Sequence, residues 1–111
     1  MIFAVDFDGT LVEHKFPEMG EPNVRLINKL KKLKRQGHSL VLWTCREGEY
    51  LTEAVNFCRA FNLIFDSVND NVPDAPYKNF ENPSRKIFAD LYIDDKAILP
   101  ENFLEIKNDT L

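Results

Sequence analysis

Four short apolar runs, separated by stretches with helical periodicity, limit what this chain can fold into. The runs cover residues 2–5, 39–43, 63–65 and 91–93, and the first two are apolar on both faces. Strands buried on both faces are typical of parallel sheets, in which helices connect successive strands. The alternation therefore predicts an α/β fold built from βαβ units, with a further short edge strand over residues 103–106.

Two amphipathic helices are predicted between these strands. The first carries Val24, Ile27 and Leu30 on one side and ends in a run of lysine and arginine, which suits the carboxyl end of a helix. The second follows from the three- and four-residue spacing of apolar residues between positions 51 and 61. Residues 68–86 contain three prolines and predict a long loop with at most one short helix.

The composition fits a single domain over residues 1–111. No apolar run approaches the ~20 residues of a membrane-spanning helix, and Asp6 and Asp8 interrupt the N-terminal apolar stretch, unlike a signal peptide. The formal net charge of −4 argues against binding nucleic acid through phosphate neutralisation. Cys45 and Cys58 lack a CxxC spacing, which indicates reduced thiols and a cytoplasmic protein.

Polar residues that follow the predicted strands form the most informative pattern. Asp6 and Asp8 follow the first strand, Thr44 the second, and Asp94 and Asp95 the fourth. Because the carboxyl ends of parallel strands lie at one edge of a sheet, these side chains are expected to converge there. Crowded carboxylates repel one another, and a shared hard cation such as Mg²⁺ removes that cost. The alternative is that each aspartate is a turn or cap residue after its own strand.

The segment Asp6-Phe7-Asp8-Gly9-Thr10-Leu11 directly follows the first predicted strand. Alternation along an extended chain places Asp6 and Asp8 on the same side. Gly9 lets the backbone leave the strand through angles that are closed to other residues. A reaction that uses one carboxylate as nucleophile and a second as acid and base would need this spacing.

With these residues the sequence resembles the haloacid dehalogenase-like (HAD) phosphohydrolases. The resemblance rests on the hexapeptide of residues 6–11, on Thr44, on Lys86 and on the Asp94-Asp95 pair, and it spans most of the chain. It implies a three-layer Rossmann-like fold with a mostly parallel central sheet of four to five strands. It also implies a bound Mg²⁺ and hydrolysis of phosphomonoesters through an aspartyl phosphate.

The resemblance further implies a role for each matching residue. Asp6 would be the nucleophile, Asp8 the general acid and base, and Thr44 a hydrogen-bond donor to the phosphoryl oxygens. Lys86 would neutralise Asp6 and the transferring phosphate. The implied metal ligands are the Asp6, Asp94 and Asp95 carboxylates and the backbone carbonyl of Asp8.

Alternatives stay open for two side chains. Lys86 would lie at the wrong end of the sheet if the fourth strand began directly after it, and Lys78 is its rival. For Arg46, a surface ion pair with Glu47 or Glu49 competes with a contact to the substrate. The substrate-binding residues expected from the sequence are Thr44, Cys45, Arg46 and Lys86.

The chain has no room for a capping domain of the kind that this family often inserts. The first predicted helix takes much of the stretch between Asp8 and Thr44, and residues 66–86 are too few for a second domain. An uncapped site is expected to be open, to accept a large or polymeric phosphorylated substrate, or to borrow a lid within a homo-oligomer. Residues 11–20 remain as a local flap, with His14 and Phe16 in it.

Two other functions fit part of the pattern. A two-component receiver domain also uses acidic residues, Mg²⁺, a threonine and a lysine, with its phospho-accepting aspartate after the third strand, where Asp66 lies. A receiver, however, has an adjacent acidic pair after its first strand, whereas Asp6 and Asp8 are spaced. A non-catalytic phosphate-binding module is the second alternative, and the presence of both Asp6 and Asp8 argues against it.

Overall fold

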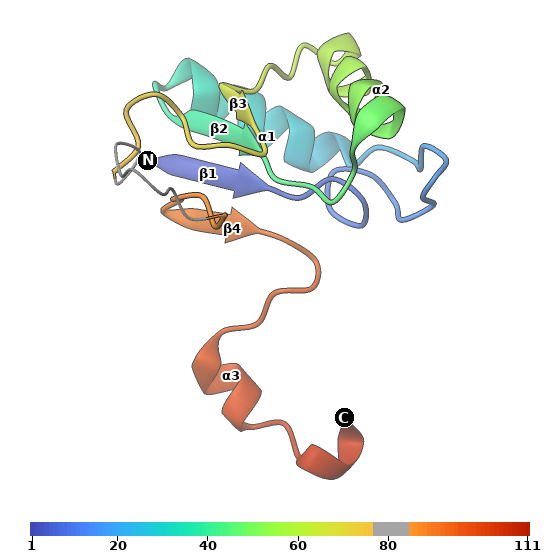
Figure 1. The fold of residues 1–111 in the computed structure, drawn as a ribbon, viewed down its shortest axis with the longest axis vertical. Coiled ribbons are helices and arrows are strands. Elements are labelled where there is room, and N and C mark those ends of the chain that lie inside the picture. The colour runs from blue at the N-terminus through green and yellow to red at the C-terminus, as the bar shows by residue number, and fades with distance from the viewer. Residues whose placement is uncertain (77–84) are drawn as a thin grey trace.

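A computed structural model describes residues 1–76 and 85–111 of the chain (Figure 1). Its core is a sheet of four strands, β1 (Ile2–Val5), β2 (Ser39–Leu42), β3 (Ser67–Val68) and β4 (Leu91–Ile93). The strand order is β3-β2-β1-β4, and every neighbouring pair is parallel. The predicted α/β fold with a parallel central sheet is confirmed.

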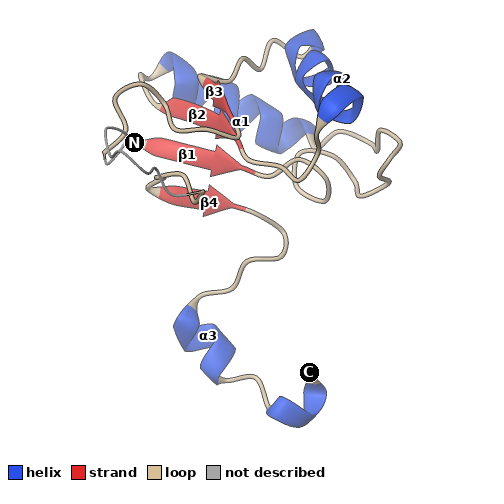
Figure 2. Ribbon diagram, in the orientation of Figure 1, coloured by secondary structure: helices blue, strands red, loops and turns tan. Residues whose placement is uncertain are grey.

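Two helices, α1 (Val24–Arg35) and α2 (Gly48–Ala60), cover one face of the sheet (Figure 2). Side chains alternate across the strands. Phe3 and Val5 of β1 pack toward the helices, whereas Ala4 faces the opposite side. There the covering layer is a loop, which contributes Val72, Ala75 and Ile87. The third layer of the fold is thus built without a helix in the part of the chain that the structure describes.

Both helices end in the same backbone motif, which sets where the next strand begins. At the end of α1, Gly37 has a φ of +94° and donates its N–H to the Lys34 carbonyl. At the end of α2, Asn62 has a φ of +61°, and the N–H of Leu63 donates to the Cys58 carbonyl. These are the hydrogen bonds of a helix C-cap with a left-handed residue after the last turn.

The third strand was predicted over residues 63–65, but β3 begins only at Ser67. The prediction is wrong because Leu63 belongs to the cap of α2 and is buried beside Cys58 in the core. The shift places Asp66 before β3, at the amino edge of the sheet. Its carboxylate accepts the N–H of Leu40 at 2.8 Å and pairs with Lys34 at 3.0 Å.

The edge strand predicted over residues 103–106 is also wrong. Residues Pro100–Leu104 form a short helix, α3, followed by the 3-10 turn Asn108–Thr110. Proline is favoured in the first turn of a helix, and Pro100 begins α3. In the described part of the chain β4 is therefore an edge of the sheet.

The expected long loop is confirmed over residues 69–76 and 85–86, while residues 77–84 lie outside the described part. No capping domain is present among the described residues, since the chain runs from β1 through one loop into α1. None of the described helices is long and apolar enough to cross a membrane.

Candidate active site

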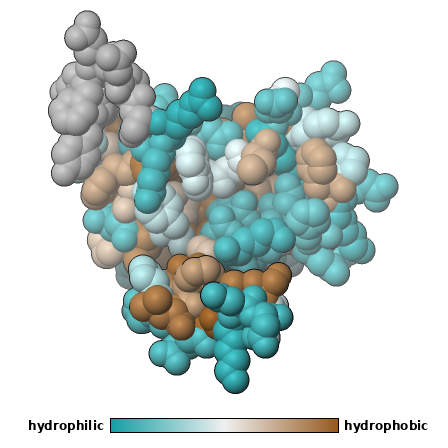
Figure 3. All heavy atoms as spheres, turned by 60° about the horizontal axis from the view of Figure 1, so that its bottom comes forward, coloured by the Kyte–Doolittle hydropathy of each residue, from teal (hydrophilic) through white to brown (hydrophobic). Residues whose placement is uncertain are grey.

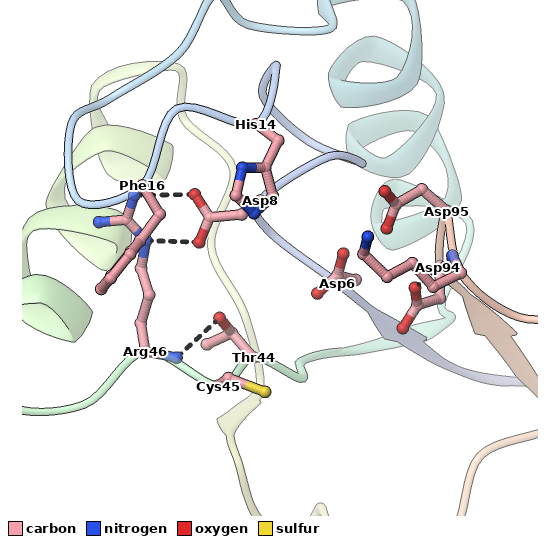
Figure 4. A pocket seen from close by; sticks show the side chains of 10 residues that line it. Asp6, Asp8, His14, Phe16, Thr44, Cys45, Arg46, Asp94 and Asp95 are labelled. Carbon is pink, nitrogen blue, oxygen red and sulfur yellow. Dashed lines mark hydrogen bonds and ion pairs between the residues drawn. The ribbon is translucent and has the colours of Figure 1, made fainter.

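A pocket of about 380 Å³ opens at the carboxyl ends of β1, β2 and β4 (Figure 4). Two of the strand ends carry the acidic residues predicted to converge. The pocket is lined by Asp6, Asp8, His14, Phe16, Thr44, Cys45, Arg46, Asp94, Asp95 and Lys96.

Asp6, Asp94 and Asp95 form a carboxylate cluster in this pocket. One oxygen of each lies within 4.8 Å of the other two. Parallel pairing of Val5 with Ile93 brings the strand ends level, and the N–H of Asp6 donates to the Ile93 carbonyl at 2.9 Å. Asp6 is half-buried and the other two are exposed. The convergence predicted from the strand ends is confirmed for these three residues.

Thr10 joins the two sides of the cluster, a role that the sequence analysis missed. Its hydroxyl donates to Asp6 Oδ2 at 3.0 Å and accepts the N–H of Asp95 at 3.1 Å. Gly9 has a φ of +89°, and a Cβ added there would lie 2.7 Å from the Asp95 carboxyl carbon. Glycine is thus required here both by the backbone conformation and by the close approach of Asp95.

The surroundings of Asp6 raise its pKa from 3.8 to about 6. Burial is the largest cause, since it removes water from the charged form. The hydrogen bond from Thr10 opposes the shift, whereas the negative charges of Asp94 and Asp95 add to it. The ionised form of Asp6 is therefore under strain, mainly from its lost hydration, and a bound cation would relieve that strain.

This strain predicts a pH-dependent difference in stability between the wild type and Asp6→Asn. Because the folded-state pKa lies above the unfolded value, ionisation of Asp6 disfavours folding: the penalty is absent below about pH 3.8 and complete above about pH 6. We expect nearly equal melting temperatures near pH 3 and a more stable variant at pH 7, measured by thermal unfolding in a metal chelator. Asp74→Asn, at an exposed carboxylate outside the pocket, should show no such pH dependence. A difference between wild type and Asp6→Asn that does not change with pH would contradict the assignment.

Asp8 is turned toward Arg46, which holds it in a two-pronged ion pair (Figure 4). Arg46 Nε donates to Asp8 Oδ2 and Nη2 to Asp8 Oδ1, both at 2.8 Å. The hydrogen bonds to Asp8 raise the pKa of Arg46, against the opposing effect of burial. Asp8 thus lines the pocket, but its carboxylate lies outside the carboxylate cluster.

Arg46 is only 3% exposed, so a surface pair with Glu47 or Glu49 is not what the structure contains. Its guanidinium lies 5.0 Å from the ring centroid of Phe7 and 5.1 Å from that of Phe16. Nη1 also donates to the Tyr50 carbonyl and Nη2 to that of Glu18. The sequence analysis missed this pairing, because Asp8 and Arg46 are far apart in the chain.

The buried pair predicts a large loss of stability when Arg46 is removed. Breaking one partner of a buried ion pair costs about 3–5 kcal/mol, because the other charge is left without compensation. We expect Arg46→Met to lower the free energy of unfolding by about 3 kcal/mol, and Asp8→Asn in the same chain to restore part of it. Urea unfolding measures both.

The exposed pair of Lys34 and Asp66 supplies the matched control. Its side chains are 33% and 35% exposed, against 1% and 14% for Arg46 and Asp8. Lys34→Met should therefore cost less than about 1 kcal/mol. Equal losses of unfolding free energy in Arg46→Met and Lys34→Met would show that the buried pair stabilises the protein no more than the exposed pair does.

Thr44 lines the pocket after β2, on the side of Asp6 that is away from Asp94 and Asp95 (Figure 4). Its N–H donates to the Asn69 side chain at 2.8 Å, and its hydroxyl oxygen accepts the N–H of Arg46 at 3.1 Å. Asn69 follows β3 with a φ of +52°, a conformation that asparagine tolerates better than most residues. Asn69 was missed, because the third strand was predicted to end at residue 65 and β3 ends only at Val68.

The structure does not bring Lys86 into the pocket. Its ammonium group lies 5.2 Å from the ring centroid of Tyr92, in the middle of β4, and β4 begins only at Leu91. The expectation that Lys86 lies in the pocket is therefore wrong. Lys86 precedes β4, and the chain enters β4 at the amino edge of the sheet, opposite the pocket. Lys78 lies outside the described residues. Among the described lysines, Lys96 alone lines the pocket.

The expected flap is present over the pocket mouth. His14 and Phe16 line the pocket, and the ring of Phe16 packs edge-on against Tyr50 with centroids 5.3 Å apart. Cys45 is an exposed free thiol at the same site. The flap leaves the carboxylate cluster open to solvent, since Asp94 and Asp95 remain exposed.

No family model matches this sequence, and no curated protein matches it either. A solved structure, described as that of a conserved protein from Bacteroides thetaiotaomicron, is similar to this chain with a TM-score of 0.78. The two sequences are 46% identical, and the alignment covers 88% of this chain and 78% of that one. At this identity and coverage, the chain belongs to the same family as the conserved Bacteroides thetaiotaomicron protein.

Proposed function

We propose that this protein is a Mg²⁺-dependent phosphatase of the HAD type, which hydrolyses phosphomonoesters through an aspartyl phosphate on Asp6. The observation that carries the proposal is the arrangement of four aspartates in one pocket. Three of them form a cluster, while Asp8 is held apart from it by Arg46. Such a site offers separate groups for cation binding and for proton transfer.

The cluster has the donor chemistry that a hard divalent cation requires. Carboxylate oxygens are preferred by Mg²⁺, and Asp6, Asp94 and Asp95 would hold the ion. The bound ion would supply positive charge against the repulsion between a phosphate dianion and Asp6.

The remaining steps belong to side chains of the pocket. An Asp6 oxygen attacks phosphorus, the bond from phosphorus to the ester oxygen breaks, and Asp8 gives that oxygen a proton. Asp8 then takes a proton from water, which attacks the aspartyl phosphate and releases inorganic phosphate and free Asp6. Thr44 binds a phosphoryl oxygen, and Lys96 is placed to compensate its charge.

Arg46 acts in this scheme as a positioning residue. Both Asp8 oxygens accept hydrogen bonds from its guanidinium. A substrate must therefore share or displace one of these bonds before Asp8 can exchange a proton with it. The Thr44 hydroxyl accepts the backbone N–H of Arg46, so the two residues are held next to each other at the pocket.

The expected substrate is a phosphorylated molecule of large size or a polymer, because no capping domain of the described chain covers the pocket. The location that we propose is the cytoplasm, where the free thiols Cys45 and Cys58 would stay reduced. The receiver-domain alternative loses support, since Asp66 lies at the amino edge of the sheet and binds the Leu40 N–H.

The test is a screen for phosphate release from nucleotides, sugar phosphates and phosphorylated polymers, with Mg²⁺ or with a chelator. Asp6→Asn protein, prepared in the same way, controls for contaminating phosphatases. Phosphate release by the wild type in the presence of Mg²⁺, but not in the presence of the chelator, supports the proposal. Phosphate binding without release from any substrate would favour the non-catalytic module instead.

A further inference from the structure

The C-terminal arm, residues 97–111, leaves the body of the protein after β4, and its helix α3 stands away from the sheet and from α1 and α2 (Figure 1). Neither core cluster contains a residue beyond Ile93. Among the described residues, no residue after Lys96 forms a hydrogen bond to the body of the protein. The N–H of Asp95 donates to the Thr10 hydroxyl. From there on, the hydrogen bonds of the arm are internal.

The arm is nevertheless apolar. More than half of the exposed large apolar side chains in the described chain lie between residue 91 and the C-terminus. Leu91 and Tyr92 of the edge strand β4 are among them, and in the arm Leu99 is 60% and Leu104 81% exposed. Figure 3, with the end that carries α3 turned forward, shows hydrophobic side chains gathered over it. Monomeric proteins rarely leave such a surface uncovered.

The chain exposes more surface than a compact monomer of its size. A folded monomer of 12.9 kDa is expected to expose about 6,300 Å², whereas this chain exposes 8003 Å². Its radius of gyration is 15.1 Å, against about 13 Å for a compact chain of this length. Two copies that each buried a surplus of about 1,700 Å² would form an interface in the range of obligate homodimers.

We propose that a second copy of this chain covers this surface, so that β4 and the arm form a two-fold dimer interface. An interface of this kind is self-complementary, and a two-fold axis beside β4 would bring the two edge strands together. The free backbone groups of an edge strand then gain partners. This inference does not depend on the proposed phosphatase activity.

The test measures molar mass in solution over about 1–100 µM protein, by light scattering and sedimentation. We expect the wild type to have twice the chain mass of 12.9 kDa, and the double variant Leu99→Glu, Phe103→Glu to be monomeric. Both substituted residues are exposed, so far-UV circular dichroism should stay unchanged. Val24→Glu is the matched control, because Val24 is 49% and Phe103 51% exposed but Val24 lies on α1.

Three outcomes overturn the proposal. A wild type that is monomeric throughout this range would mean that the arm is free or covered by something other than a second copy. A dimer that persists in Leu99→Glu, Phe103→Glu would place the interface elsewhere. Dissociation by Val24→Glu as well would show that any added charge, and not this surface, decides the state.

Discussion

Asp6→Asn is expected to remove phosphatase turnover for every substrate, by about 10⁴-fold or more. The amide of asparagine is a poor nucleophile, so the attack on phosphorus has no substitute group. Cys58 cannot take over, since it lies in the hydrophobic core and does not line the pocket. The measurement is steady-state phosphate release, with Asp74→Asn as a control that should keep full activity. A residual rate within tenfold of the wild type would show that Asp6 is not the nucleophile.

The covalent route has its own signature in Asp8→Asn. An activated aryl phosphate needs little protonation of its leaving group, so the first step should survive while hydrolysis of the aspartyl phosphate slows by about 10²–10⁴-fold. The phosphorylated protein should then accumulate, visible as added mass on the peptide that contains Asp6. Repeated turnover of the wild type in ¹⁸O-labelled water, with label in phosphate but never in Asp6, would instead establish direct attack by water.

Removal of divalent cations is expected to abolish turnover while leaving the fold intact. The Asp6, Asp94 and Asp95 carboxylates lie within 4.8 Å of one another, so without a cation the pocket repels a phosphate dianion. A chelator should reduce phosphate release to background, and added Mg²⁺ should restore it, while circular dichroism stays constant. Calorimetric titration with Mg²⁺ gives a second readout that needs no substrate.

The double variant Asp94→Asn, Asp95→Asn tests whether the cation requirement arises from the carboxylate cluster. Both residues are exposed, so the variant should fold, yet it should bind Mg²⁺ weakly and lose turnover. The matched control is Asp70→Asn, at an exposed carboxylate outside the pocket. Phosphatase activity that survives exhaustive chelation would refute the cation requirement.

The sequence by itself determined three strands of the sheet and the carboxylate cluster. Residues 2–5, 39–42 and 91–93 are apolar enough to be strands wherever a hydrophobic layer can cover them. Parallel pairing then places the residues after β1 and β4 side by side, so that Asp6, Asp94 and Asp95 meet by geometry alone. Local spacing and strand direction were sufficient for this part of the site.

Only the tertiary structure decided which groups neutralise these charges and where the shorter elements begin. The pairing of Asp8 with Arg46 joins residues that are 38 positions apart, and no local pattern encodes such a contact. The cap of α2 draws Leu63 into the core and delays β3, which moves Asp66 to the opposite edge. Lys86 lies beside Tyr92, whereas Lys96 is the lysine that lines the pocket among the described residues. The spacing of apolar residues determines which face of a strand or helix a side chain occupies. The residue that the side chain contacts depends on how distant segments of the chain are brought together.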